Sequence, residues 1–208
     1  RTMPAKLLEV NRRILNNHHG RLPDGGKVSF THIIGWAVVK ALRQMPELNV
    51  SFARIDGAPY ALRHPHVNLG LAIDLERPDG SRVLLVPNIK AADQMEFRQF
   101  WLAYEDVVRK TRANKLTPDD FAGTTVTLTN PGIYGSLFGT PVINQPQVAI
   151  LGIGAITKRP VVIDDAIAIR SMAYLSLSFD HRVIDGAVAD QFMADLKARL
   201  EAWTDWQD

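Results

Sequence analysis

Hydrophobic positions recur along the chain at two spacings, one typical of helices and one typical of strands. Over residues 5–19 they return every three to four positions, which predicts an amphipathic helix that ends before a Pro/Gly turn. Residues 30–45 are apolar nearly all round, which predicts a buried helix with Ser29 or Thr31 as its N-cap. Two more amphipathic helices are predicted, over 94–112 and 187–203.

Short runs that alternate or are rich in β-branched residues lie between these helices and predict strands. Asp-Gly turns separate the first three runs, 49–55, 66–75 and 81–89, and we expect these strands to lie in one sheet. The other predicted strands are 124–130, 147–156, 161–170 and 172–179. Because helices interleave with strands without a strict βαβ repeat, the pattern favours a single α/β sandwich with a mixed sheet.

Composition narrows the function classes. The chain has 208 residues, 46% of them hydrophobic, a net charge of +2 and no run of five like charges, so we expect no nucleic-acid partner. It contains no cysteine, which excludes disulfides, thiolate metal sites and a cysteine nucleophile. We predict a cytoplasmic protein without a membrane partner, since no apolar run approaches the ~18 residues that span a bilayer. Because it begins without a methionine, we expect a fragment of a longer chain.

The first candidate chemistry lies after the last predicted strand. His181 follows that strand, and Asp185 stands four residues later, before a glycine and a helix. Imidazole titrates near neutral pH, so a half-buried histidine here can take a proton from a thiol or hydroxyl and return it; it can also be a packed polar residue. Asp185 either caps the helix or supports His181 or a nearby arginine as the acid of a triad does. The sequence favours capping, and both roles can hold together.

The second candidate is the end of the Thr-rich strand 124–130. Thr129 offers a hydroxyl and Asn130 an amide, and both groups can donate a hydrogen bond to a developing oxyanion. A long loop with several glycines and prolines follows, and loops of this length often line a site. The alternative is a polar strand end that bonds to its own turn.

We interpret the remaining candidate residues, two histidines and four tryptophans, as structural. His64 and His66 could chelate a metal, but the proline between them and the lack of a nearby carboxylate favour a solvated turn, so we expect no metal. Two of the four tryptophans are predicted in the core, and two are predicted to pack on a neighbouring subunit or on a part of the chain missing here. The core pair is Trp36 and Trp101, and the other pair is Trp203 and Trp206.

Two motifs carry a family resemblance. DHRVIDG at 180–186 and TLTNPGIYG at 127–135 resemble the active-site motifs of the dihydrolipoyl acyltransferase component of 2-oxoacid dehydrogenase complexes. The first has the form His-x-x-x-Asp-Gly, which the related chloramphenicol acetyltransferases share. Further similar blocks stand in the same order, so the resemblance covers nearly all of 1–208. It implies a chloramphenicol-acetyltransferase-like sandwich with a mixed β-sheet and flanking helices, forming one acyltransferase catalytic domain.

The resemblance also implies roles for single residues. His181 would be the general base that takes the thiol proton of coenzyme A, so that the thiolate attacks the thioester of an acylated dihydrolipoyl arm. Thr129 would hydrogen-bond the tetrahedral oxyanion, and Asp185 would support the geometry. Asn130 is a candidate substrate-binding residue, as is Arg182, which would pair with an acid in the interface or with a phosphate of coenzyme A. In this family the site lies between neighbouring chains of a trimer.

Partners follow from what the chain lacks. It has no lipoyl domain and no subunit-binding domain, so the lipoyl group would come from another domain or protein. The expected partners are the thiamine-dependent 2-oxoacid dehydrogenase and dihydrolipoamide dehydrogenase components, around a homotrimer or a larger multiple of trimers.

The sequence resembles two branches of the family, and these differ in the acyl group that they transfer. Residues 1–20 and 108–132 resemble the acyltransferase-like domain of fused actinobacterial 2-oxoglutarate dehydrogenase/decarboxylase chains, whereas 140–154 and Asp185 resemble stand-alone acyltransferases. We expect succinyl transfer, with acetyl or branched-chain transfer, or a mainly scaffolding trimer, as alternatives. The same blocks disfavour a free-standing antibiotic acetyltransferase.

Overall fold

A mixed β-sheet forms the centre of the protein. The structure, a computed structural model, describes residues 1–19 and 25–202. Within them the sheet contains β1 (Thr2–Pro4), β4 (Leu69–Leu71), β7 (Asn88–Ile89), β8 (Val126–Thr129), β9 (Ala149–Ile153), β10 (Thr157–Ile163) and β11 (Ala166–Phe179). Its order is β1-β11-β9-β8-β4-β7, and β10 pairs with the first part of β11. β8 is parallel to both its neighbours, and the other pairs are antiparallel, as a mixed sheet requires.

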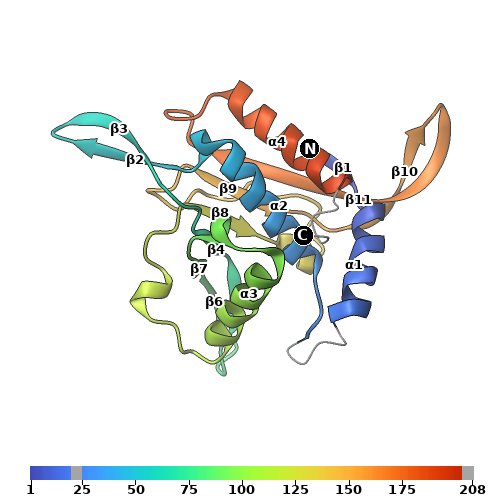
Figure 1. Ribbon diagram of the computed structural model, residues 1–208, viewed down its shortest axis with the longest axis horizontal. Helices are drawn as coiled ribbons and strands as arrows, with labels where there is room; N and C mark the ends of the chain where they lie inside the picture. The colour runs from blue at the N-terminus through green and yellow to red at the C-terminus, as the bar shows by residue number, and fades with distance from the viewer. Residues whose placement is uncertain (20–24, 203–208) are drawn as a thin grey trace.

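The helices predicted from hydrophobic spacing are confirmed, with α2 and α4 lying across the sheet in Figure 1. Ser29 caps α2, with its hydroxyl accepting from the backbone N–H of His32. The α-helices are α1 (Lys6–His19), α2 (Phe30–Gln44), α3 (Phe97–Arg112) and α4 (Gly186–Glu201). Short 3₁₀ helices are η1 (Pro46–Leu48), η2 (Ala92–Gln94), η3 (Pro118–Asp120) and η4 (Pro131–Tyr134). Among the described helices, none is long and apolar enough to cross a membrane.

The core lies between α2 and the sheet. Trp36 and Trp101 are buried in it, as predicted, at 1% and 5% exposure. Gly35 lets α2 approach the sheet, because a Cβ there would stand 3.3 Å from a methyl group of Leu128. On α1 the apolar stripe is narrower than the spacing suggested, since only part of it is buried. Leu8 and Leu15 are buried, whereas Leu7 and Ile14 are exposed. Trp203 and Trp206 lie outside the described residues.

Two predictions about strands are wrong. The first three runs do not share one sheet. In the part of the chain that the structure describes, β2 (Val50–Ile55) forms a ladder with β3 (Ala58–Arg63) and a single isolated bridge from Ser51 to Gln147, and β5 (Ile73–Glu76) pairs with β6 (Arg82–Leu85). Only β4 and β7, drawn from the second and third runs, join the main sheet. A two-residue turn at Asp56 and Gly57, both with positive φ, folds β2 and β3 into a separate ribbon.

Residues 161–170 form a hairpin where the sequence predicted one strand. Asp164 and Asp165 have φ values of 49° and 59°, in the left-handed region that aspartate tolerates better than β-branched residues do. The chain therefore reverses between β10 and β11, and the paired ends of these strands project from the body of the molecule (Figure 1).

Candidate active site

His181 lies just beyond the end of β11, in a turn. The N–H groups of Val183 and Ile184 both donate to the carbonyl of Asp180 at 3.0 Å, and the Asp180 N–H donates to the carbonyl of Val148 at 2.8 Å. This tight turn leaves His181 exposed in the single chain, more so than the half-buried position expected of a base. Its ring centroid is 5.4 Å from that of Phe179.

Asp185 is the N-cap of α4, which confirms the capping prediction. Its backbone is extended, with φ −84° and ψ 165°, and its carboxylate accepts from the N–H of Val188 at 2.8 Å. The sequence forms this cap locally, because a short acidic side chain before Gly186 can satisfy N–H groups of the first turn. No hydrogen bond joins Asp185 to His181 or Arg182 in the described part of the chain.

Arg182 is held by its own chain. Its Nε and Nη2 donate to the two carboxylate oxygens of Asp180, at 2.9 and 2.6 Å, and its guanidinium lies 3.9 Å from the ring centroid of Phe52. The hydrogen bonds from Arg182 lower the pKa of the Asp180 carboxyl. Arg182 thereby ties the His181 turn to the β2–β3 ribbon. Its predicted pairing with an interface acid or a phosphate stays a prediction.

Thr129 ends β8 and lines a cavity of about 620 Å³, here called the Thr129 cavity. The floor comes from β8 and β9, and the walls come from the segment around β5–β6 and from the loop after β8. The lining residues are Ala72, Leu84, Val86, Thr127, Thr129, Pro131, Gly139, Thr140, Pro141, Val142, Asn144 and Ile150. Most of these side chains are apolar, so the cavity suits an uncharged chain.

Asn130 does not face the Thr129 cavity. Its side-chain amide donates to the hydroxyl of Thr31 at 2.8 Å, which links the end of β8 to the first turn of α2. It lines a different, smaller cavity of about 250 Å³ together with Ser29 and Thr31. In the single chain the amide therefore has a structural partner, and its predicted role towards substrate stays a prediction.

The loop after Thr129 is packed closely on β9. A Cβ on Gly132 would stand 2.4 Å from the carbonyl carbon of Gly154, so only glycine allows this approach. The N–H of Ala155 donates to the carbonyl of Ser136 at 2.8 Å. These contacts hold the loop, and with it one wall of the Thr129 cavity, against the sheet.

The strand register keeps His181 and Thr129 apart. In the register, Thr129 is level with Gly152 and Ser176, whereas Phe179, the last residue of β11, is level with Ala149. Three residues along the strands and two strand spacings across them separate Thr129 from Phe179 by about 14 Å. His181 lies beyond Phe179, so the two predicted catalytic groups do not meet within one chain.

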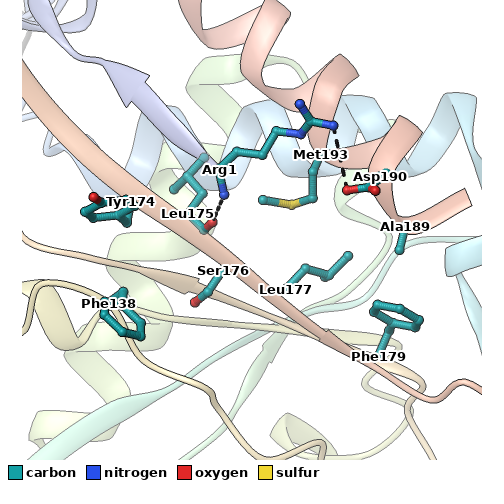
Figure 2. Close-up of a pocket in the computed structure, with 10 residues that line it drawn as sticks. All are labelled: Arg1, Phe138, Tyr174, Leu175, Ser176, Leu177, Phe179, Ala189, Asp190 and Met193. Atoms are coloured by element: carbon teal, nitrogen blue, oxygen red, sulfur yellow. Dashed lines mark hydrogen bonds and ion pairs between the residues drawn. The ribbon is translucent and has the colours of Figure 1, made fainter. Parts of the chain in front are cut away.

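A further cavity, of about 470 Å³, lies beside β11 and α4 (Figure 2). Leu177 and Phe179 point towards it from the strand, and Met193 points towards it from the helix. At its rim the amino group of Arg1 donates to the carbonyl of Leu175 at 2.7 Å. It is mostly apolar, and none of the predicted catalytic residues lines it. No group of three or more metal-binding side chains occurs among the described residues.

One cluster beside the Thr129 cavity escaped the sequence analysis. Asp74, Arg82 and Tyr134 form hydrogen bonds with one another, and they lie on the β5–β6 ribbon and η4, two elements that also line this cavity. The local signal was the presence of acidic and basic residues on the hairpin 73–85, and nothing in the sequence connected Tyr134 to them.

Comparisons with known proteins show the family of this chain. Residues 2–207 match the family described as 2-oxoacid dehydrogenases acyltransferase (catalytic domain). The multifunctional 2-oxoglutarate metabolism enzyme of Mycobacterium sp. (strain JLS) is 46% identical over 200 residues, which are 93% of this chain and 16% of that enzyme. The chain therefore spans only a small part of the length of the curated relatives it matches.

Solved structures place the fold among acyltransferases. A probable dihydrolipoamide acetyltransferase from Listeria monocytogenes has a TM-score of 0.87 at 33% identity, covering 97% of this chain and 82% of that one. The cubic core of a pyruvate dehydrogenase multienzyme complex has a TM-score of 0.86 at 33% identity, covering 96% of this chain and 79% of that one. Chloramphenicol acetyltransferase shares the fold, with a TM-score of 0.59 at 14% identity, covering 96% of this chain and 86% of that one.

A third structure bears on the site. Azotobacter vinelandii dihydrolipoamide acetyltransferase is 32% identical, with a TM-score of 0.86 over 96% of this chain and 79% of that one. It was studied for the roles of a serine, a histidine and an asparagine in its catalytic mechanism, and these three are spaced by 52 and 4 positions. With its sandwich of mixed sheet and helices, this chain belongs to the family of 2-oxoacid dehydrogenase acyltransferase catalytic domains.

Proposed function

We propose that this chain transfers an acyl group, preferably succinyl, from an acyl-dihydrolipoyl thioester to coenzyme A, in a site shared by two chains of a homotrimer. The carrying observation is a spacing. Thr129, His181 and Asp185 are separated by 52 and 4 positions, as are the serine, histidine and asparagine studied in the Azotobacter acetyltransferase. Each replacement keeps a related group, a hydroxyl for a hydroxyl and a carboxylate for an amide.

The reaction needs a base and an oxyanion donor. His181 accepts the thiol proton of coenzyme A, and the thiolate attacks the carbonyl carbon of the acyl-dihydrolipoyl thioester. The carbonyl oxygen becomes an oxyanion, to which the Thr129 hydroxyl donates a hydrogen bond. When the tetrahedral intermediate collapses, the bond to the dihydrolipoyl sulfur breaks, and that sulfur takes the proton back from the imidazolium of His181.

A second chain supplies the missing half of this arrangement. Within one chain, the strand register keeps His181 and Thr129 apart, and His181 is exposed. In a closed symmetric ring, each chain can present its His181 to the Thr129 cavity of the next. We infer that each trimer holds its sites at the boundaries between chains, and that larger multiples of trimers can form.

The substrates and partners follow from the same reaction. Both reactive sulfurs belong to the substrates, since the chain has no cysteine. Residues 1–208 act as the catalytic domain, with the lipoyl arm supplied from elsewhere. The name of the Mycobacterium relative supports succinyl, because decarboxylation of 2-oxoglutarate, with oxidation of the remaining four-carbon unit by the lipoyl disulfide, leaves a succinyl group on the dihydrolipoyl sulfur. The partners are the thiamine-dependent dehydrogenase and dihydrolipoamide dehydrogenase components, and we place the reaction in the cytoplasm.

Mixing two inactive variants tests the shared site. His181→Ala and Thr129→Val are each expected to lower transfer of succinyl from succinyl-dihydrolipoamide to coenzyme A, His181→Ala by about 10²–10⁴-fold. Refolding the two variants together in equal amounts would place an intact His181 beside an intact Thr129 at about one boundary in four, restoring about a quarter of the wild-type rate. Size-exclusion chromatography with light scattering checks that each variant remains a trimer.

The outcomes separate the alternatives. Recovery only in the mixture supports a shared site, whereas no recovery from two correctly assembled variants contradicts it. A wild-type trimer without measurable transfer from any acyl-dihydrolipoamide would favour the scaffold function. Faster transfer of acetyl or a branched-chain group than of succinyl would change the acyl preference but keep the mechanism.

A further inference from the structure

The wall of the Thr129 cavity formed around β5 and β6 is a separate structural unit. These strands pair with each other, Asp74 opposite Leu84 and Glu76 opposite Arg82, and neither joins the main sheet. Leu84 lines the cavity from this ribbon. The ribbon joins the sheet where β4 leads into β5 and where β6 leads into β7. Its position over the cavity therefore depends on side-chain contacts beyond these two connections.

One side-chain bridge joins this ribbon to the opposite wall. The Tyr134 hydroxyl donates to Oδ2 of Asp74 at 2.6 Å and accepts from Nη2 of Arg82 at 2.9 Å. Arg82 also donates from Nε to the same carboxylate oxygen of Asp74 at 2.9 Å, and from Nη1 to Glu76 at 3.1 Å. Its guanidinium carbon lies 5.5 Å from the centroid of the Tyr134 ring.

The charges of the bridge reinforce its hydrogen bonds. The hydrogen bonds from Arg82 and then Tyr134 lower the pKa of the Asp74 carboxyl, so it is a carboxylate at neutral pH. The hydrogen bond to Asp74 raises the pKa of the Tyr134 phenol, so the hydroxyl keeps its proton. A charged acceptor and a neutral donor make a stronger hydrogen bond than two neutral groups do.

The far end of the bridge rests on a fixed support. Tyr134 is the last residue of η4, which begins two positions after Thr129, and the loop here is packed on β9 through Gly132 and Ser136. The bridge therefore ties the β5–β6 ribbon to a loop that is packed against the residues at the end of β9. Both of these elements line the Thr129 cavity, the ribbon through Leu84 and η4 through Pro131.

We propose that Tyr134 is a positioning residue that sets the width of the Thr129 cavity by holding the β5–β6 ribbon through Asp74 and Arg82. This inference rests on the proposed function, because it assigns the cavity to one of the two substrates, coenzyme A or the acyl-dihydrolipoyl thioester. Without the bridge the ribbon samples wider positions, and the substrate must order it on binding. Thr129 itself stays in place, so the loss falls on binding rather than on the chemical step.

Tyr134→Phe tests the proposal, since it removes the hydroxyl and keeps the ring. For the substrate that occupies the cavity, either coenzyme A or the acyl-dihydrolipoyl thioester, KM should rise about three- to tenfold, while kcat stays within about twofold. Asp74→Asn should have a similar effect, and the double variant should add little, because both changes break one bridge. Tyr60→Phe, at an exposed tyrosine on the β2–β3 ribbon, is the matched control.

The result also distinguishes this inference from the proposed function. An inactive wild-type trimer contradicts the proposed function. If the wild type is active and Tyr134→Phe leaves KM unchanged for both coenzyme A and the acyl-dihydrolipoyl thioester, the positioning role alone is overturned. A loss confined to kcat overturns it too. Equal changes in Tyr134→Phe and Tyr60→Phe would likewise overturn it. Thermal unfolding of each variant shows whether it is folded under the assay conditions.

Discussion

Replacement of Asp185 separates a structural role from a catalytic one. Asp185→Ala removes the carboxylate that accepts from the N–H of Val188 at 2.8 Å and leaves that N–H in an exposed first turn, where water can reach it. N-cap replacements by alanine cost about 1 kcal/mol, within a range of about 0.5–2 kcal/mol. For a domain of this size, each kcal/mol lowers Tm by about 2–4 °C.

The assay compares stability and activity in three variants. Asp185→Asn and Asp185→Ser keep a side-chain oxygen that can cap the helix, and asparagine is also the residue type studied in the Azotobacter acetyltransferase. Both should stay within about 0.5 kcal/mol of the wild type in urea unfolding at one protein concentration. If capping is the main role, the activity that Asp185→Ala loses should largely return at temperatures well below its Tm.

A different result would refute the reasoning. If Asp185→Ala left the unfolding midpoint unchanged but abolished acyl transfer, the carboxylate would act on the reaction and not on the helix. If Asp185→Ser restored stability without restoring activity, the same conclusion would follow. The single chain, in which Asp185 bonds to the backbone of α4, predicts neither result.

Two further predictions concern the neighbourhood of the site. Burial lowers the pKa of His64 below its ordinary value of 6.5, so the unfolded chain binds this proton more tightly. The free energy of unfolding therefore falls as the pH drops from 6.5 through the folded pKa, and His64→Gln should flatten this slope in urea midpoints measured between pH 7.5 and 5. Gly132→Ala should lower the free energy of unfolding by about 1–3 kcal/mol, because the new Cβ would overlap Gly154. Gly139→Ala should unfold near the wild-type temperature, because a Cβ there would stand 3.8 Å from Pro131.

The sequence by itself determined the local elements. Helical spacing predicted the four helices, and the residue types at their starts predicted the caps at Ser29 and Asp185. These signals work because a helix and its cap depend on side chains and N–H groups within about four residues of each other. The family motifs likewise predicted Thr129 and His181 as site residues, since each lies in a short continuous segment, and their roles stay predictions.

Only the tertiary structure decided which segments meet. Turns that close on themselves kept β2, β5 and β6 out of the main sheet, and the register separated His181 from Thr129. Asn130 binds Thr31 across 99 positions, and Tyr134 binds Asp74 across 60. Such pairs form because packing brings distant segments together, and no periodicity or local propensity encodes which of many polar side chains will meet.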